Sequence, residues 1–232
     1  MHVPVLLHEV LEALRPAQSV RVIDGTLGAG GHTQALLAAG AGEVLAFDLD
    51  TLALEIARAK LAAFGERVHL VHASYLQMAQ EAAALGWDKV DAILLDLGIS
   101  SMQVDTPERG FSFRHDAPLD MRFNPDGGER PMAAELLNTL DESELANIFY
   151  RYGEETQSRR VAREVVKHRP YTTTGQLAAV IERTLPRPKG RHSIHPATRV
   201  FQALRIAVND ELNTVDKALP IAVDLLKSGG RF

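Results

Sequence analysis

The sequence contains no cysteine among its 232 residues. Disulfides, thiolate metal sites and cysteine nucleophiles are therefore excluded. The absence of cysteine fits a reducing compartment, and we predict a cytoplasmic location. Long apolar runs are missing as well, because no stretch approaches the roughly 18 residues that a membrane-crossing helix needs. His2, Glu9 and Glu12 interrupt the first apolar segment, so we expect neither a signal peptide nor a membrane partner.

Hydrophobic residues make up 46% of the chain and charged residues 24%, which is ordinary for a globular protein. At a typical size of about 150 residues per domain, the length predicts one domain with an insertion or a small partner domain.

The net charge of −5 is unevenly distributed. Residues 155–205 carry eleven Lys and Arg but only three acidic residues, a net charge of +8, and the rest of the chain carries −13. This asymmetry indicates a surface for a polyanion on an otherwise acidic protein. The alternative is a set of solvated, arginine-rich helix faces.

The first hundred residues alternate between two kinds of segment. Strand-like apolar runs cover residues 20–23, 43–47, 68–71 and 90–95, and helix-like segments cover 32–39, 52–64 and 76–85. Asp24, Asp48 and Asp96 each follow one of the apolar runs. Such alternation predicts a Rossmann-like α/β fold, with a mostly parallel sheet and helices on both faces.

The alternation stops after residue 104. Residues 105–128 are rich in Pro, Gly, Asp and Arg and predict an ordered functional loop. Helical patterns follow at residues 156–168, 174–185, 196–217 and 221–227, and Asp141 with Glu144 predicts a further helix start. We therefore predict a sheet domain of residues 1–104 and 196–232, interrupted by a loop and helical domain of residues 105–195.

A glycine-rich loop, DGTLGAGGH, follows the first predicted strand at residues 24–32. Ligands of open α/β sheets bind at the carboxyl ends of strands, and glycine lets a ligand approach the backbone closely. Asp48 follows Gly28 by 20 residues, where an acidic side chain can accept hydrogen bonds from an adenosine ribose. The pattern predicts a nucleoside cofactor, and a structural glycine turn without a ligand is the alternative.

The spacing of the glycines helps to distinguish a dinucleotide cofactor from S-adenosylmethionine. A dinucleotide fingerprint starting at Gly28 would place its third glycine at position 33, which is Thr33. A carboxylate such as Asp24 would repel a pyrophosphate but attract the cationic amino-acid tail of S-adenosylmethionine. The residues therefore favour S-adenosylmethionine over NAD, with an NAD-dependent oxidoreductase as the alternative.

Asp96 would border the sulfur of the methyl donor in such a fold. An acceptor there can bind an N–H of a target amine and take up developing positive charge. Its alternative role is to cap the turn around Gly98.

Six strings in the chain resemble one known family. They are HVPVLL (2–7), DGTLGAGGH (24–32), LLDLGISSMQ (94–103), RGFSF (109–113), PLDMR (118–122) and HPATRVFQALRI (195–206). The chain is similar over essentially its whole length to the bacterial small-subunit ribosomal RNA cytosine-N4 methyltransferases, the RsmH or MraW family. The resemblance implies a class I methyltransferase fold dependent on S-adenosylmethionine, with an inserted helical domain for RNA. It also implies methyl transfer to the exocyclic N4 of a cytidine in 16S ribosomal RNA.

The resemblance extends to individual cofactor positions. Family positions map onto Gly30, Gly31, His32, Asp48, Tyr75, Asp96 and Gln103. Relatives often have Phe in place of Tyr75, and either ring could pack on an adenine. With Asp24 and Gly28 from the loop argument, these residues form the predicted cofactor site, and Asp96 is the predicted catalytic acceptor.

The basic segment supplies candidate RNA contacts, since phosphate contacts by basic groups position RNA. We predict that Arg159, Arg160, Arg163, Lys167, Arg187, Lys189, Arg191 and Arg199 bind RNA. Phe111, Phe113 and Phe123 could stack on an unstacked base, or they could pin the loop to its domain.

Several alternatives stay open at this level. A methyltransferase for protein or small molecules and a non-catalytic RNA-binding module are the other candidate functions. The spacing of His192, His195, Asp116 and Asp120 is not typical of metal ligands, and we expect no metal. The substrate could be free RNA or the assembled small subunit, and the protein could be a monomer or a homodimer.

The family resemblance also implies further C-terminal strands and a Phe-His-Ser-Leu-Glu-Asp-Arg motif. We therefore expect a chain that ends at Phe232, with a fifth strand only beginning at residues 229–232, to be poorly stable or inactive.

Overall fold

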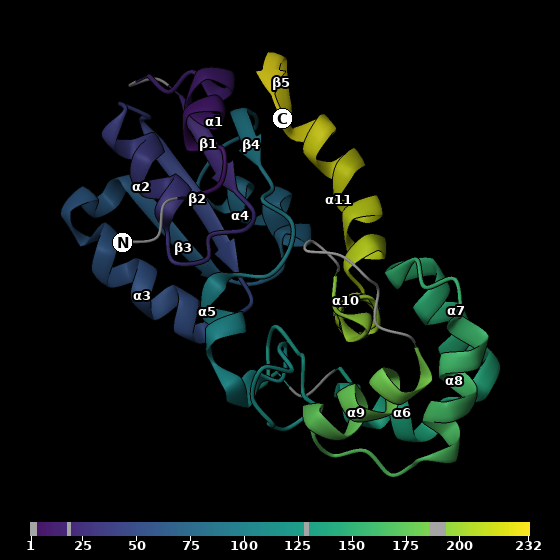
Figure 1. The fold of residues 1–232 in the computed structure, drawn as a ribbon. Coiled ribbons are helices and arrows are strands. Elements are labelled where there is room, and N and C mark those ends of the chain that lie inside the picture. The colour runs from purple at the N-terminus through teal and green to yellow at the C-terminus, as the bar shows by residue number, and fades with distance from the viewer. Residues whose placement is uncertain (1–3, 18–19, 128–129, 186–193) are drawn as a thin grey trace. The chain divides into compact units, whose positions relative to one another are not determined.

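The computed structural model describes residues 4–17, 20–127, 130–185 and 194–232 (Figure 1). The chain forms two compact units, one of Met1–Gly98 with Asn213–Phe232 and the other of Ile99–Leu212. The second unit is inserted into the sequence of the first.

The described part of the first unit contains a five-stranded parallel sheet in the order β3-β2-β1-β4-β5. The strands are β1 (Arg21–Asp24), β2 (Glu43–Asp48), β3 (Val68–His72), β4 (Val90–Leu94) and β5 (Leu226–Arg231). In the centre, Val22 of β1 pairs with Val44 on one side and Ala92 on the other. This topology confirms the predicted Rossmann-like fold.

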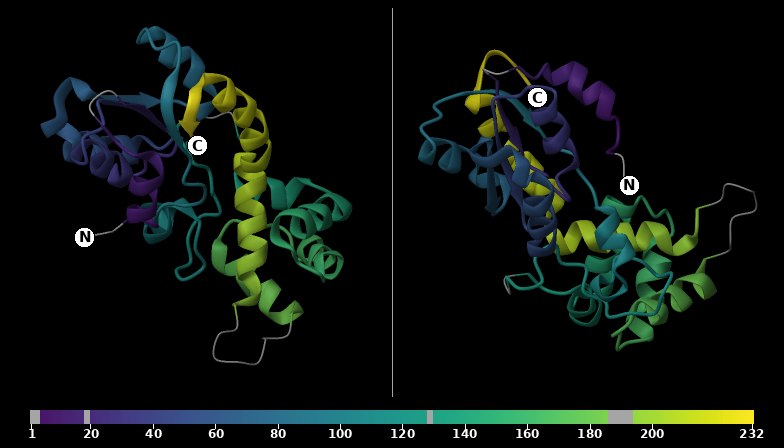
Figure 2. Two further views of the ribbon diagram at one scale, coloured as in Figure 1. Left: turned by 90° about the horizontal axis from the view of Figure 1, so that it is seen from above. Right: turned by 90° about the vertical axis from the view of Figure 1, so that its left-hand side faces the viewer.

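Helices cover both faces of the sheet (Figures 1 and 2). The side chains of Val22 and Val44 pack with α1 (Leu7–Leu14), α2 (Gly31–Ala38) and α3 (Thr51–Leu61). Ile23 and Leu45, one residue further along each strand, pack with α4 (Met78–Ala84) and α11 (Glu211–Leu225). Short 3₁₀ turns η1 (Ala62–Arg67) and η2 (Tyr75–Gln77) flank β3. Both faces are apolar because successive strand residues point to opposite sides and both sides are covered.

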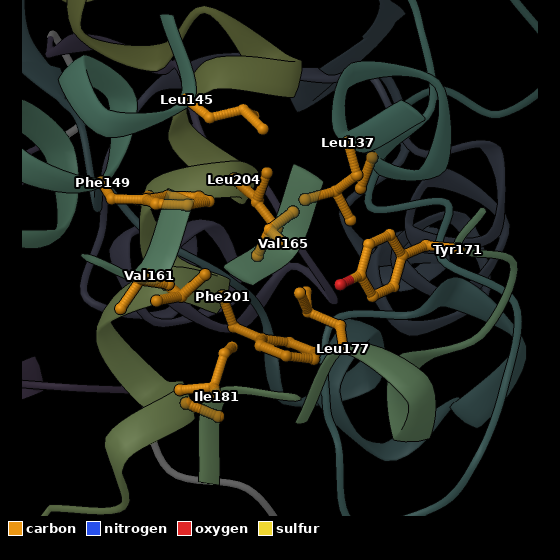
Figure 3. Close-up of a cluster of buried hydrophobic side chains, with 14 of the residues drawn as sticks. Leu137, Leu145, Phe149, Val161, Val165, Tyr171, Leu177, Ile181, Phe201 and Leu204 are labelled. Atoms are coloured by element: carbon orange, nitrogen blue, oxygen red, sulfur yellow. The ribbon is translucent and has the colours of Figure 1, made fainter. Parts of the chain in front are cut away.

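The second unit is helical. Its elements are α5 (Ser101–Asp105), η3 (Pro107–Arg109), α6 (Ala133–Thr139), α7 (Glu142–Gly153), α8 (Ser158–Lys167), α9 (Thr174–Thr184) and α10 (Pro196–Asn209). Figure 3 shows Phe149, Val165 and Leu204 converging in its core. The start of α7 confirms the predicted helix start, because Asp141 and Glu144 form a reciprocal capping box.

The predicted domain boundaries differ from those of the two units. We placed residues 196–232 with the sheet, but the buried residues of α10, among them Val200, Phe201 and Leu204, belong to the helical core. The unit therefore ends at Leu212 rather than at residue 195, and it begins at Ile99 rather than at residue 105.

The predicted helix over residues 196–217 is also wrong in its C-terminal part. It breaks at Asp210, which has a left-handed backbone (φ 52°) that Asp tolerates better than most residues. The side chain of Asn209 turns inward there, accepting from the Phe123 N–H and donating to the Met121 carbonyl. The predicted helix of residues 221–227 is instead part of α11, which contains Pro220, and β5 begins at Leu226 rather than near Gly229.

The described residues of the predicted loop, 105–127, are an integral part of the helical unit. Phe111, Leu119 and Met121 are buried in its core. The Leu119 N–H donates to the Thr172 carbonyl, and the Thr174 N–H donates to the Ala117 carbonyl. The loop is thus held by both backbone bonds and side-chain packing, as predicted for an ordered loop, and its functional role stays a prediction.

Candidate functional site

The glycine-rich loop crosses the carboxyl ends of three neighbouring strands. The Gly25 N–H donates to the carbonyl of Leu94, the last residue of β4, and the Leu27 N–H donates to the carbonyl of Phe47 in β2. The loop then enters α2 at Gly30. It therefore lies where ligands of open parallel sheets bind.

Asp24, the last residue of β1, is 1% exposed and accepts hydrogen bonds from residues of this loop and of α2. Its Oδ1 accepts from the Thr26 N–H at 3.1 Å and its Oδ2 from the Thr33 hydroxyl at 2.6 Å. Burial raises the pKa of the Asp24 carboxyl, and the two hydrogen bonds oppose that rise. The structure thus gives Asp24 a supporting role in the loop, and its predicted contact with a cofactor stays a prediction.

Asp48, at the end of β2, is half-buried beside the loop. Its Oδ2 accepts from the Gly28 N–H at 2.7 Å and its Oδ1 from the Asp50 N–H at 2.9 Å. The pKa of this carboxyl is raised above its ordinary value, because the effect of burial outweighs the opposing effect of the two backbone hydrogen bonds. Each carboxylate oxygen has two acceptor sites, so Asp48 retains capacity for a ligand hydroxyl.

The three glycines of the predicted site have different surroundings. A Cβ on Gly28, which has φ +51°, would meet no atom within 4 Å. A Cβ on Gly30 would lie 3.2 Å from Leu61 Cδ1, and one on Gly31 would lie 2.6 Å from Pro4 Cγ. Gly28 is therefore the position that faces open space, whereas Gly30 and Gly31 are needed for internal packing.

Asp96 lies two residues beyond β4 and its side chain is 50% exposed. Its backbone N–H donates to the Thr26 hydroxyl at 2.7 Å. Its Oδ2 lies 3.5 Å from Nε2 of His32, whose side chain is 8% exposed. Asp24, Thr26, Asp96 and His32 thus form one polar cluster at the carboxyl end of the sheet.

Tyr75 and Gln103 are placed differently. Tyr75 opens η2 and packs partly against the core on the α4 face, near Gly25. Gln103 belongs to the second unit, where it forms a capping box with Ser100 at the start of α5. For both residues the role in cofactor binding stays a prediction.

The basic residues of α8 lie on its outer face. Val161, Ala162 and Val165 of this helix are buried. Arg159, Arg160, Arg163 and Lys167 are exposed, as is Arg199 of α10. These five cations are accessible from solvent, while Arg187, Lys189 and Arg191 lie outside the described residues, as does His192.

Six of the cations that the structure describes in residues 155–205 have partners. Arg160 donates to Gln157 Oε1, Arg163 and Lys167 lie 3.6 and 3.7 Å from carboxylates of Glu142 and Glu164, and Arg199 donates to the Glu154 carbonyl. The other two, Arg169 and Arg205, have partly buried partners. Arg169 donates through Nε to the Leu137 carbonyl at 2.6 Å and also to the Leu140 carbonyl. Arg205 forms two hydrogen bonds with Glu211, at 2.7 and 3.1 Å. The charge of the segment is therefore only partly a solvent-facing surface.

The three phenylalanines of the loop face the interior of the helical unit. Phe111 is buried, and Phe113 and Phe123 pack against the same core. Phe113 also packs against His195, with ring centroids 4.6 Å apart and the rings tilted by 31°. These contacts support the interpretation that the rings pin the loop.

Among the described residues, no group of three or more His, Asp or Glu is placed to hold a metal ion. In the same residues, no helix has both the length and the apolar character to cross a membrane.

With the geometry of the site established, similarity to known proteins identifies the family. The sequence pattern of the MraW methylase family matches residues 1–232. The chain belongs to the MraW methylase family. This membership and the Rossmann-like sheet agree with the class I methyltransferase fold that the motifs predict.

Two relatives illustrate the similarity. The chain is 49% identical to "Ribosomal RNA small subunit methyltransferase H" of Mycolicibacterium paratuberculosis, over 100% of this chain and 63% of that protein. It is 48% identical to the protein of the same name in Citrifermentans bemidjiense, over 99% of this chain and 75% of that one. The chain thus spans less than two thirds of the length of the first of these MraW relatives.

Solved structures are similar only in part. An rRNA methylase from Streptococcus thermophilus aligns with a TM-score of 0.36 and 23% identity, over 42% of this chain and 58% of that one. The putative methyltransferase SMU.1697c of Streptococcus mutans, in complex with SAH, aligns with a TM-score of 0.37 and 22% identity, over 43% of this chain and 56% of that one. Similarity at this level supports no detail of the site.

Sequence reasoning missed three residues that build the site. Thr33 entered only as the residue that breaks a dinucleotide pattern, yet it bonds to buried Asp24. Thr26 links Asp24 to Asp96, and Pro4 explains why position 31 is glycine. A polar residue in the first turn of α2, directly after a strand that ends in a buried acid, was the available signal for Thr33.

Proposed function

We propose that the protein transfers a methyl group from S-adenosylmethionine to the exocyclic N4 of a cytidine in small-subunit ribosomal RNA. One observation carries the proposal in this MraW family member. Gly28 faces open space, and the carboxylates of Asp48 and Asp96 lie on the neighbouring strand ends.

The residues present fit S-adenosylmethionine. Asp48 would accept hydrogen bonds from the ribose hydroxyls with its remaining lone pairs, and Gly28 would let the ligand approach the backbone. Gly30, Gly31 and His32 would form the adjoining wall at the start of α2, and Tyr75 would pack on the adenine. Asp24 would act through its charge on the cationic amino-acid tail, since both of its oxygens already bond within the fold.

When bound, the cofactor supplies a methyl group already activated on a positively charged sulfur. The protein then has to align the acceptor amine in line with it. Asp96 would accept a hydrogen bond from one N–H of the amine and so turn the nitrogen toward the methyl carbon. As the amine gains the methyl group it loses one proton, which leaves toward the exposed Asp96 carboxylate and water.

The exposed cations of α8 support RNA as the substrate class. Arg159, Arg160, Arg163 and Lys167 follow one another on a helix whose other side is buried, so they present charge without losing packing. Such groups bind phosphates and position RNA without reading its sequence. The names of the relatives add the small ribosomal subunit, and a substrate of this kind supports a cytoplasmic location.

An assay with the full-length protein tests the proposal. Methyl-labelled S-adenosylmethionine is incubated with small-subunit RNA, or with assembled subunits, and the nucleosides are separated by mass spectrometry. We expect label in N4-methylcytidine. Label on another base or on protein, or no transfer to either substrate, would contradict the proposal.

A further inference from the structure

His72 ends β3 and is the register partner of Asp48, the last residue of β2. The two residues therefore lie side by side at the carboxyl ends of neighbouring parallel strands. Nε2 of the exposed His72 lies 2.9 Å from the carbonyl oxygen of Leu49, the residue that follows Asp48. The last residue of β3 thus contacts the turn through which the chain leaves β2.

The contact between His72 and Leu49 has a defined direction. A carbonyl oxygen can only accept a hydrogen bond, so Nε2 is the donor and carries a proton. The distance of 2.9 Å is the usual one for an N–H···O hydrogen bond. The side chain of His72 is therefore a donor to the backbone of this turn.

The Leu49 carbonyl belongs to the same peptide unit as the Asp50 N–H. That N–H donates to Oδ1 of Asp48 at 2.9 Å. A trans peptide unit is planar, and its C=O and N–H point in opposite directions. A donor that fixes the carbonyl therefore also fixes the direction of the N–H. Through this one rigid group, His72 determines where the hydrogen that holds Oδ1 of Asp48 lies.

The Asp48 carboxylate is held at both of its oxygens. Its Oδ2 accepts from the Gly28 N–H at 2.7 Å, and its Oδ1 accepts from the Asp50 N–H. The remaining acceptor positions therefore point in fixed directions, and a preorganised acceptor binds a ligand without a further cost of ordering. Without the Asp50 N–H, the terminal torsion of the side chain has a broad range of angles available.

We propose that His72 is a positioning residue for cofactor binding, which fixes the Leu49–Asp50 peptide and so aims the Asp48 carboxylate at the ribose hydroxyls. This inference rests on the contact between Asp48 and the ribose that the proposed function includes. The alternative is a purely structural role, in which the bond only joins the ends of two strands.

Two substitutions of His72 and one matched control separate these roles. In His72→Gln the side-chain amide nitrogen takes the place of Nε2, so a donor is kept, whereas His72→Leu removes it. The control is His69→Leu on the same strand, because the His69 ring contacts Glu43 at the start of β2. The probes are S-adenosylhomocysteine and its 2′-deoxy analogue, which differ by one ribose hydroxyl. Their Kd values are measured by calorimetry on the full-length protein.

We expect the wild type to bind S-adenosylhomocysteine at least about tenfold more tightly than the 2′-deoxy analogue, as for the loss of a hydrogen bond to a charged group. His72→Gln should keep this ratio within about twofold of the wild-type ratio. His72→Leu should reduce the ratio to less than about threefold, and His69→Leu should leave it unchanged. An unchanged ratio in His72→Leu, or an equal fall in His69→Leu, would overturn the inference.

Kinetics and stability provide independent readouts. His72→Leu should raise the KM of S-adenosylmethionine by about 3- to 10-fold and keep kcat within about twofold, because the ribose contact is made equally in the ground state and the transition state. The Tm should stay within about 3 °C of the wild-type value, since the side chain is exposed. A lower kcat with an unchanged KM would overturn the inference in favour of a role at the reacting centre.

A double-mutant cycle covers the case in which His72→Leu is less stable than expected. If His72 acts through Asp48, His72→Leu should not weaken S-adenosylmethionine binding further in an Asp48→Asn background. Additive losses would overturn the inference. A wild type that binds both probes equally would instead refute the ribose contact of Asp48, and one that methylates no RNA would refute the proposed function. The failures are therefore distinguishable.

Discussion

The Thr33 hydroxyl donates to Oδ2 of Asp24 at 2.6 Å, and both residues are buried. This bond ties the first turn of α2 to the end of β1. It also explains why position 33 is a threonine, since a glycine there would leave one oxygen of a buried carboxylate without its donor. The conformation of the loop that carries the predicted cofactor residues thus depends on the buried hydrogen bond between Thr33 and Asp24.

Replacing Thr33 by valine tests the importance of this contact for stability. The shape of the side chain is kept, but a buried carboxylate oxygen loses its donor. We expect the free energy of unfolding to fall by about 1–3 kcal/mol, measured by urea denaturation. Thr156→Val, at an exposed position, is the matched control and should change stability by less than about 0.5 kcal/mol. Equal effects of the two substitutions would contradict this account.

Buried Asp24 should also make stability depend on pH. Burial raises the pKa of its carboxyl above the ordinary value of 3.8. At a pH between the ordinary pKa of the unfolded chain and the raised pKa of the folded protein, the folded protein binds the proton more tightly than the unfolded chain does. The contribution of Asp24 to stability therefore falls as pH rises through this window. Asp24→Asn removes this ionisation.

The unfolding free energy of Asp24→Asn minus that of the wild type should therefore rise with pH across this window and then level off. Urea denaturation of both proteins between about pH 3 and pH 7 measures it. A difference that stays constant through the window would show that Asp24 has no raised pKa.

The hydroxyl of Tyr171 is also buried but, unlike the carboxylate of Asp24, it has no hydrogen-bond partner among the described residues. The residue is 1% exposed, and burial raises its pKa to about 12. Figure 3 shows this hydroxyl inside the apolar cluster. Tyr171→Phe should leave stability unchanged or raise it by about 1 kcal/mol. A loss of more than about 1 kcal/mol in thermal or urea unfolding would reveal a partner for the hydroxyl.

Gly28 and Gly31 should respond differently to alanine. At Gly28 the cost is backbone strain of about 1 kcal/mol, with the added methyl group directed into the proposed cofactor site. We expect weaker S-adenosylmethionine binding in calorimetry with a small loss of stability. At Gly31 the methyl group meets Pro4, and overpacking should cost about 1–3 kcal/mol of stability. Equal binding of the cofactor by wild type and Gly28→Ala would remove Gly28 from the site.

The basic face of α8 should set the salt dependence of RNA binding. Replacing Arg159, Arg160 and Lys167 by glutamine removes three exposed charges. The slope of log affinity against log salt should fall by about 2, because each lost phosphate contact contributes about 0.7 on single strands.

The matched control for that variant removes the same charge from the sheet unit. It replaces Arg15, Arg58 and Lys60, all exposed, by glutamine. This control should leave the slope unchanged, as measured by filter binding or anisotropy over a salt series. Identical slopes in both triple variants would exclude α8 as the RNA surface.

The alternating part of the fold could be predicted from the sequence because its strands are buried on both faces. Apolar runs such as residues 44–47 end at polar residues, and that pattern locates the strand ends and the loop around Gly28. The family motifs predicted the class of fold that the sheet shows.

The second half resisted prediction because its boundaries depend on tertiary contacts. Nothing local separates α10 from α11 except Asn209 and Asp210, whose conformation is stabilised by a side chain bonding to Met121 and Phe123 far away in the sequence. The assignment of α10 to the helical unit depends in the same way on Phe201 and Leu204 packing there.

The site itself was predictable as a set of strand-end acids but not as a network. Spacing identified Asp24, Asp48 and Asp96, but it could not show that Asp24 points inward while Asp96 remains half exposed. The link through Thr26, and the approach of His32 to Asp96, depend on how the loop folds over three strands.

The central claim is methylation of a ribosomal cytidine at N4, and one measurement tests it most directly. Small-subunit ribosomal RNA is isolated from cells with and without the gene for this protein, and its nucleosides are quantified by mass spectrometry. The account predicts that N4-methylated cytidine disappears from the RNA of the deletion strain and returns when the gene is restored. An unchanged level of N4-methylated cytidine in the deletion strain would contradict it.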